Sequence, residues 1–291
     1  MNIKKLEAIV KTAECKSVSL AAAELGLTQS AVSHLIADFE EELGFSVLVR
    51  SRRGAVLTPQ GEKIFPYLTE ICRQYAQMLQ EAESINGVEE GTVRIGTFSS
   101  VAVHWLPGIL KSFEKDYPKI EIRLLNGDYH DVEQWLRKAE IDVGFTTLPC
   151  TAPCRTELLF EDRLLAILPK DHRLAAGEVL PLKALEGEPF IGLLESSNQD
   201  ARNAMAKAGM KLHVKYNTKD DYAVIAMVEN GLGYSIMPEL LLKGRTENVA
   251  VLELDPPSTR KIAVAVPDSS GISPPAAVFI EYVRNWLQNN A

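Results

Sequence analysis

The sequence predicts an α/β protein with a winged helix-turn-helix at its N-terminus, a long linker helix, and two α/β lobes. Three observations predict this architecture. Two short helical segments joined by a tight turn precede residue 44, apolar residues recur with heptad spacing over 64–85, and strands alternate with helices from residue 91 onward. The length of 291 residues also favours several compact units over one domain.

Composition indicates a soluble globular chain that stays in the cytoplasm, with no membrane partner. Hydrophobic residues make up 46% of the chain, yet no apolar run approaches the ~20 residues that cross a bilayer. The N-terminus lacks the features of a signal peptide. Cys15, Cys72, Cys150 and Cys154 are scattered, which fits a reducing compartment. No second Cys or His pair stands beside the last two, so we expect no zinc, and no other metal or cofactor.

Charge is distributed unevenly along the chain. Basic and acidic residues balance over 1–61, so the whole net charge of -8 lies beyond residue 61. Within the first part, Arg50, Arg52 and Arg53 crowd into "RSRRG". Because salt screens charges more than about 10 Å apart, a local basic patch can meet phosphate on an acidic protein. The net charge therefore does not exclude DNA.

The segment 29–43 predicts a helix with one buried stripe and one polar face. The other face begins with Gln29, Ser30, Ser33 and His34, which can hydrogen-bond to bases or phosphates. A short helix over 19–25 precedes it, and Gly26 and Thr28 can end the first helix and cap the second. A plain helical hairpin is the alternative interpretation. The stripe consists of Val32, Leu35, Ile36, Phe39 and Leu43.

After this helix, "SVLVRSRRGAVLTPQG" predicts a β-hairpin that turns at Gly54 and carries the three arginines. The order Ala22-Ala23-x-Leu25, "TQSAVS", "FEEELG", "VLVR" and "LTPQG" resembles the winged helix-turn-helix of LysR-type transcriptional regulators over residues 3–61. Ser30 and His34 stand where the family often has Pro and Arg. The resemblance implies that Gln29, Ser30 and His34 face the bases. It also implies contacts with the DNA backbone or minor groove from Thr28, Ser33, Arg50, Arg52 and Arg53. For His34, the alternative is a solvated surface histidine with no role in binding.

Residues 62–87 predict a dimerising linker helix, after a cap at Thr58 and Pro59 in the first turn. An identical helix is the simplest partner for its apolar seam, although packing against its own domain is the alternative. Pro66 can bend the helix. The resemblance implies a homodimer, usually a homotetramer, on double-stranded operator DNA, with RNA polymerase as a further partner. The seam is Ile64, Leu68, Ile71, Tyr75, Met78, Ala82 and Ile85.

Residues 88–291 predict an effector-binding domain of two lobes, each a parallel sheet with helices on both faces. Lobe I covers about 91–163 and 267–291, and lobe II covers about 164–266, with crossings near 163–166 and 264–267. "IDVGF", "LPKDHRLA" and "ENGLGYSIMPE" resemble the LysR effector domain, which shares its fold with periplasmic solute-binding proteins. The resemblance implies a small molecule in the cleft between the lobes.

Ligands of open α/β sheets bind at the carboxyl ends of strands, and this rule selects loops rich in hydroxyls and amides. Hydroxyl and amide groups in these loops favour a small polar or carboxylate effector. The selected residues are Thr97, Ser99, Ser100, Thr146, Thr147, Ser196, Ser197, Asn198, Gln199 and Thr218.

Two other function classes compete with this interpretation. A hydrolase could use Ser99 or Ser100 with His104, but no G-x-S-x-G motif surrounds them, so we expect no enzyme. A regulator that senses oxidation through Cys150 and Cys154 is the more serious alternative, because the spacing permits a disulfide.

Overall fold

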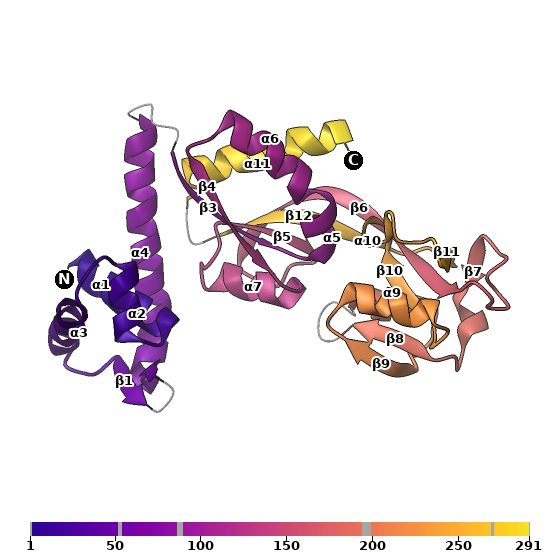
Figure 1. Ribbon diagram of the computed structural model, residues 1–291, viewed down its shortest axis with the longest axis horizontal. Helices are drawn as coiled ribbons and strands as arrows, with labels where there is room; N and C mark the ends of the chain where they lie inside the picture. Colours follow the sequence, from indigo (N-terminus) through magenta and orange to yellow (C-terminus); the bar gives the residue numbers. More distant parts are fainter. Residues whose placement is uncertain (1, 52–53, 86–89, 194–198, 269–270, 291) are drawn as a thin grey trace. The chain divides into compact units, whose positions relative to one another are not determined.

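The computed structural model describes residues 2–51, 54–85, 90–193, 199–268 and 271–290 (Figure 1). The chain divides into two compact units, residues 1–88 and residues 89–291. Over the described ranges, no helix combines the length and the apolar character that spanning a membrane requires.

The first unit is a helix-turn-helix followed by a hairpin and a long helix, as the sequence predicts. Thr28 caps the second helix of the motif, since its Oγ1 accepts a hydrogen bond from the backbone N–H of Ala31 at 3.2 Å. Gly26 turns the chain between the two helices with a φ of +65°. The elements are α1 (Ile3–Cys15), α2 (Val18–Glu24), α3 (Gln29–Leu43), β1 (Leu48–Ser51), β2 (Gly54–Leu57) and α4 (Pro59–Ile85).

The apolar stripe of α3 packs into the core of this unit with one exception. Val32, Ile36 and Phe39 are buried against α1, and each such side chain contributes about 1.5–3 kcal/mol relative to exposure. Leu43 was expected in the stripe, but it is 37% exposed. The helix ends there, at Gly44 with a φ of +76°, so its last residue lies beyond the core.

The β1–β2 hairpin is anchored to the junction of α1 and α2 at Gly54. This residue has a φ of +99°, and a Cβ there would collide with the backbone oxygen of Lys16. The neighbouring Ala55 donates its N–H to that same oxygen at 2.8 Å. A glycine is therefore required at this position, and the wing starts from a fixed point.

The linker helix α4 buries only the beginning of its heptad seam in its own unit. Leu68 is 4% exposed and belongs to the core cluster of the unit, which confirms the alternative of packing against its own domain for this part. Ile71, Tyr75 and Met78 are 39%, 38% and 55% exposed. The second half of the seam therefore presents apolar side chains at the surface.

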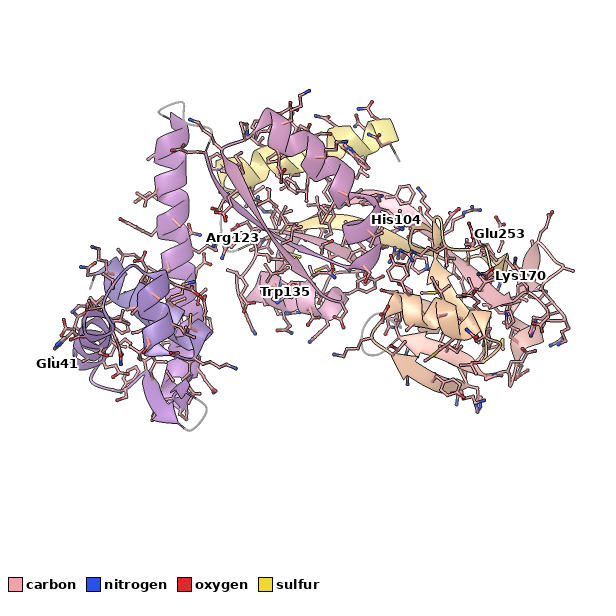
Figure 2. The ribbon with its side chains drawn as sticks, viewed as in Figure 1. Glu41, His104, Arg123, Trp135, Lys170 and Glu253 are labelled. Carbon is pink, nitrogen blue, oxygen red and sulfur yellow. The ribbon has the colours of Figure 1, made fainter. Side chains whose placement is uncertain are left out.

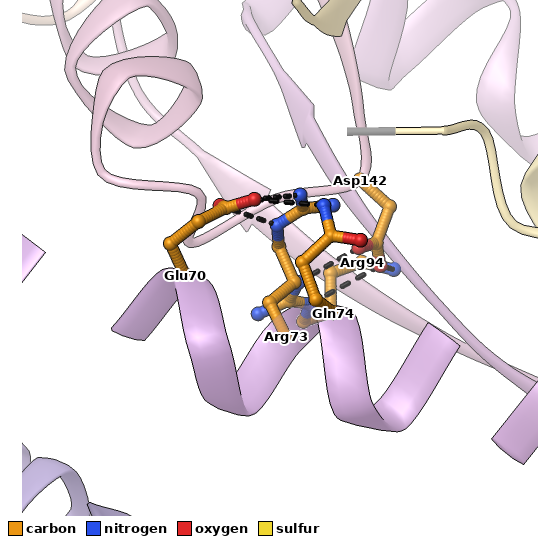
Figure 3. Close-up of polar contacts among 5 residues, drawn as sticks. All are labelled: Glu70, Arg73, Gln74, Arg94 and Asp142. Carbon is orange, nitrogen blue, oxygen red and sulfur yellow. Dashed lines mark hydrogen bonds and ion pairs between the residues drawn. The ribbon is translucent and has the colours of Figure 1, made fainter. Parts of the chain in front are cut away.

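Figure 3 draws two ion pairs, one in each unit. Glu70 accepts from Arg73 Nε at 2.9 Å along the α4 surface. In the second unit, Arg94 Nη2 donates to Asp142 Oδ1 at 2.7 Å, while the Arg94 backbone N–H donates to the same carboxylate at 2.9 Å. The latter pair fixes β3 (Gly91–Thr97) to the segment that enters β5 (Val143–Leu148).

Lobe I of the second unit is a mixed sheet in the order β4-β3-β5-β12-β6. Helices α6 and α11 pack on one face and α7 on the other (Figure 1). Its strands are β3 (Gly91–Thr97), β4 (Ile120–Asn126), β5 (Val143–Leu148), the first part of β6 (Cys154–Pro169), and β12 (Thr259–Pro267). Its helices are α5 (Ser99–His104), α6 (Leu106–Asp116), α7 (Tyr129–Arg137) and α11 (Pro274–Asn290).

Lobe II is built on the remainder of β6, which pairs there with β10 and β11. A separate parallel pair of strands, β8 and β9, also belongs to lobe II. The hydrophobic core of lobe II is distinct from that of lobe I. Its strands are β7 (Val179–Pro181), β8 (Phe190–Leu193), β9 (Val214–Thr218), β10 (Ser235–Pro238) and β11 (Val249–Asp255). Its helices are η1 (Leu182–Leu185), α8 (Gln199–Lys207), α9 (Asp221–Glu229) and α10 (Glu239–Leu242).

The strand pairing corrects two expectations. Parallel pairing joins β4, β3 and β5, whereas β12 and β6 run antiparallel to their main neighbours, so the lobes are not purely parallel sheets. The chain crosses into lobe II along β6 near residue 164, as expected, but it returns over 256–258 instead of 264–267. The reason is that β11 and β12 both pair with the single long strand β6, one in each lobe.

Candidate functional site

The first candidate surface is the N-terminal turn of α3 in the first unit. Gln29, Ser30 and His34 are exposed on one face of this helix, and Ser33 is half-buried beside them. The cap at Thr28 leaves that hydroxyl engaged with the backbone of α3. The surface therefore offers an amide, hydroxyls and an imidazole, which suit base edges in a major groove.

The predicted wing residues are only partly described. Arg50 lies on β1, where it pairs with Ala55 of β2. Arg52 and Arg53 lie outside the described residues.

The second candidate site is a cavity where the two lobes of the second unit meet. Its volume is about 30 Å³, room for about two water molecules, since one needs about 10–15 Å³. Lobe I contributes the start of α5 and α7, and lobe II contributes the start of α9 and α10. The lining residues are Phe98, Ser99, Ser100, Gly127, Tyr129, Leu193, Asp221, Pro238, Leu241 and Arg260.

Arg260 is the centre of the polar network in this cavity. Its Nε and Nη2 donate to Asp162 Oδ2 at 2.9 and 2.7 Å, and the two side chains are 3% and 1% exposed. Asp162 Oδ1 accepts the backbone N–H of Leu240 at 3.0 Å. The guanidinium also lies 5.3 Å from the ring centre of Phe98. A buried guanidinium is tolerated here because its charge is paired and its donors are used.

The guanidinium of Arg260 also donates hydrogen bonds to two hydroxyl groups of lobe I, of which only Ser100 was selected from the sequence. Arg260 Nη2 donates to Ser100 Oγ, and Nη1 donates to the hydroxyl of Tyr129, both at 2.6 Å. Tyr129 is held in place by an edge-to-face contact with Phe98, whose ring centre lies 4.9 Å away. Arg260 therefore fixes two lobe I side chains that point into the cavity.

Two hydrogen bonds cross the cavity from hydroxyls of lobe I to aspartates of lobe II. Tyr129 donates to Asp200 Oδ2 at 2.9 Å, and Ser99 donates to the carboxylate of Asp221. Both aspartates lie in the first turn of a helix, α8 or α9. These bonds join the lobes through groups that a ligand could also engage.

Both bridging aspartates hold their protons more tightly than usual. Burial raises the pKa of Asp200, although the nearby Arg260 opposes the shift. Burial also raises the pKa of Asp221, although the bond from Ser99 opposes it. Desolvation therefore outweighs both the helix dipole and the hydrogen bonds, so these carboxylates lack a full counter-charge.

Comparison with known proteins identifies the two units. Residues 3–62 match the family described as "Bacterial regulatory helix-turn-helix protein, lysR family", and residues 86–288 match "LysR substrate binding domain". The chain belongs to the LysR family. It is 34% identical to the uncharacterized HTH-type transcriptional regulator YvbU of Bacillus subtilis (strain 168), over 98% of each chain. It is 32% identical to the probable HTH-type transcriptional regulator LrrA of Synechococcus elongatus, over 98% of this chain and 97% of LrrA.

A solved structure supports the same fold. Full-length OxyR from Pseudomonas aeruginosa superposes with a TM-score of 0.81 at 22% identity, covering 99% of this chain and 95% of that one. The protein is thus a LysR-type DNA-binding transcriptional regulator with an effector domain.

The structure brings together only part of the effector residues selected from the sequence. Ser99 and Ser100 line the cavity. Thr97 and Thr146 are buried in β3 and β5, outside the lining. Thr147 also lies on β5, and the hydroxyl of Thr218 accepts the backbone N–H of Asp220 at 3.2 Å. Ser196, Ser197 and Asn198 lie outside the described residues, and the Gln199 amide donates to Asn203 at 2.8 Å.

Sequence reasoning missed four polar or charged residues in and around this cavity. Tyr129 and Asp221 follow the ends of β4 and β9, so the strand-end rule could have selected them with the hydroxyl residues. Arg260 and Asp162 gave no such signal, because they lie inside the antiparallel strands that connect the lobes.

The hydrolase alternative finds no geometric support among the described residues. The hydroxyl of Ser100 is bonded to Arg260, and that of Ser99 to Asp221. His104, labelled on α5 in Figure 2, has a buried Nε2 that meets no partner in the described part of the chain. Burial, helped by the charge of Lys243, lowers the pKa of His104. Its imidazole is therefore not arranged to take a proton from either serine.

Proposed function

We propose that this LysR-type regulator binds specific operator sequences through α3 and is controlled by a small polar effector in the Arg260 cavity. It acts in the cytoplasm, where its DNA partner lies. The observation that carries the effector assignment is the small cavity between the lobes, beside charged side chains that bridge them. A ligand that needs more room than a few water molecules is accommodated when the lobes separate, so its binding is coupled to their arrangement.

The charges around the cavity favour a polar effector that carries a positive group over a carboxylate. Asp162, Asp200 and Asp221 all lie near the buried guanidinium of Arg260. The helix N-termini of lobe II, which would attract an anion, already carry acidic residues: Asp200 on α8, and Asp220 and Asp221 on α9. An ammonium group beside Asp221 supplies the counter-charge that the carboxylate lacks.

A thermal-shift comparison of the full chain tests this effector class. Putrescine, butanediol and succinate share a four-carbon backbone and differ in end-group charge. Ligand at a hundredfold excess over its dissociation constant adds about 2.7 kcal/mol of stability. We expect the largest shift with putrescine, its loss in Asp221→Asn, and its retention in Glu281→Gln, a control on α11. A larger shift with succinate would contradict the positive-group assignment, and no shift from any polar compound would contradict an effector site.

The exposed half of the α4 seam supports a dimer as the DNA-binding form, with two recognition helices on paired half-sites. In this proposal Gln29, Ser30 and His34 face bases, while Thr28, Ser33, Arg50, Arg52 and Arg53 contact the DNA backbone or minor groove.

A further inference from the structure

Two cysteines lie in direct contact beside the connection from β5 to β6. Cys150 follows β5, and Cys154 is the first residue of β6. Their Sγ atoms are 3.2 Å apart, and both are free thiols. A disulfide brings its sulfurs to about 2.05 Å, so a movement of roughly 1.2 Å would bond them.

The loop that holds these thiols is anchored to α7. The backbone N–H of Thr151 donates to Glu133 Oε1 at 3.0 Å, and Arg137 donates to Thr151 Oγ1 at 2.8 Å. Ala152 is buried against α7. The sulfurs are therefore held together by the fold of lobe I and not only by their spacing in the sequence, which raises their effective concentration.

The surroundings favour sulfur–sulfur chemistry over metal binding. Among the residues that the structure describes, no group of three or more His, Cys, Asp or Glu is placed to hold a metal ion. Burial, together with the contact from Cys150, raises the pKa of Cys154 to about 12. At neutral pH, the Cys154 thiol is thus protonated.

We propose that Cys150 and Cys154 form a reversible disulfide when the protein meets a hydroperoxide. With hydrogen peroxide, the Cys150 sulfur takes one oxygen as the O–O bond breaks, which gives a sulfenic acid and one water. The Cys154 sulfur then attacks that sulfur, and its proton leaves with the hydroxyl as a second water. Two thiols are oxidised by two electrons, and one peroxide is reduced to two waters. A dithiol reductant reverses the bond by exchange.

The site is separate from the effector cavity, so it goes beyond the proposed effector response and does not depend on it. The bond would close the loop between β5 and β6, and β6 carries Asp162, the partner of Arg260, farther along. Oxidation would thus act on the strand that connects the two lobes.

Alkylation and mass spectrometry of the full chain test the proposal directly. The reduced protein is treated with stoichiometric hydrogen peroxide, alkylated with iodoacetamide and digested. We expect the peptide segments with Cys150 and Cys154 to lose alkylation together and to be found linked, lighter by two hydrogens. Dithiothreitol should restore both sites. Cys15 and Cys72 serve as internal references that keep their alkylation.

Variants separate a specific pair from general oxidation. Cys150→Ser and Cys154→Ser should each abolish the intrachain link, whereas Cys15→Ser should leave it unchanged. The proposal is wrong if both thiols stay alkylated in the oxidised wild-type protein. It is equally wrong if they are oxidised only to sulfinic acid, or linked only between chains.

Discussion

At the scale of single residues, Thr28 and Gln29 are neighbours with different predicted roles. Gln29→Ala removes an exposed amide and should reduce discrimination at one base pair by about 1–3 kcal/mol. Thr28→Ala removes the cap of α3 and should weaken binding to every sequence alike, with a loss of about 1 kcal/mol in helix stability. Fluorescence anisotropy on an operator and its single-base variants distinguishes these outcomes. Equal loss on all sequences for Gln29→Ala would contradict its base-facing role.

Arg260 and Asp162 form a buried pair whose two halves depend on each other. Arg260→Met leaves the Asp162 carboxylate buried without its partner, which should cost about 3–5 kcal/mol of unfolding free energy. The double variant Arg260→Met with Asp162→Asn should lose less, because no uncompensated charge remains. Urea unfolding followed by tryptophan fluorescence reports this unit alone, since every tryptophan lies beyond residue 89.

A double variant as unstable as the single one would show that packing, and not charge, explains the loss.

Residue roles could be predicted from the sequence only where one local rule sufficed. Ser99 and Ser100 follow the end of a strand, and the structure places both in the cavity. Arg260 reaches that cavity from the beginning of the antiparallel strand β12, and its partner Asp162 lies 98 residues earlier in the chain. Such long-range pairing leaves no periodic signal in one sequence.

At the scale of elements, α4 carries the prediction for assembly. Tyr75→Glu or Met78→Glu places a charge on the exposed half of the seam, and each should convert a dimer to monomers without unfolding the unit. Ala76→Glu, which adds the same charge on the exposed helix surface off the seam, is the matched control. Light scattering coupled to size-exclusion chromatography gives the mass. An unchanged mass for both seam variants would contradict dimerisation through this surface.

Element prediction succeeded where periodicity is strong and failed where pairing partners decide. Caps, turns and the apolar stripe located α3, although Leu43 lies past the core at the final turn. Heptad spacing located α4 but could not separate Leu68, which packs in its own unit, from the exposed Met78. Alternation of strands and helices predicted the α/β lobes, but it gave no information about the antiparallel direction of β12.

At the scale of the whole molecule, most of the acidic charge lies in a different unit from the predicted DNA-binding surface. Residues 1–61 are neutral in sum, residues 62–88 carry a net charge of -2, and the effector half, residues 89–291, carries the remaining -6. Screening limits repulsion between that half and DNA to distances of about 10 Å. Regulation then requires that a ligand bind one arrangement of the protein better than another, with a coupling free energy of about 1–3 kcal/mol.

Control of DNA binding by the cavity is tested most directly by a titration of operator DNA with the full chain, with and without the compound that gives the largest thermal shift. We expect the ligand to change operator affinity by about 5- to 150-fold in the wild-type protein. The same ligand should have no effect in Asp221→Asn, whose affinity for DNA alone should match the wild type. Identical titration curves with and without saturating ligand would contradict control of DNA binding by the cavity.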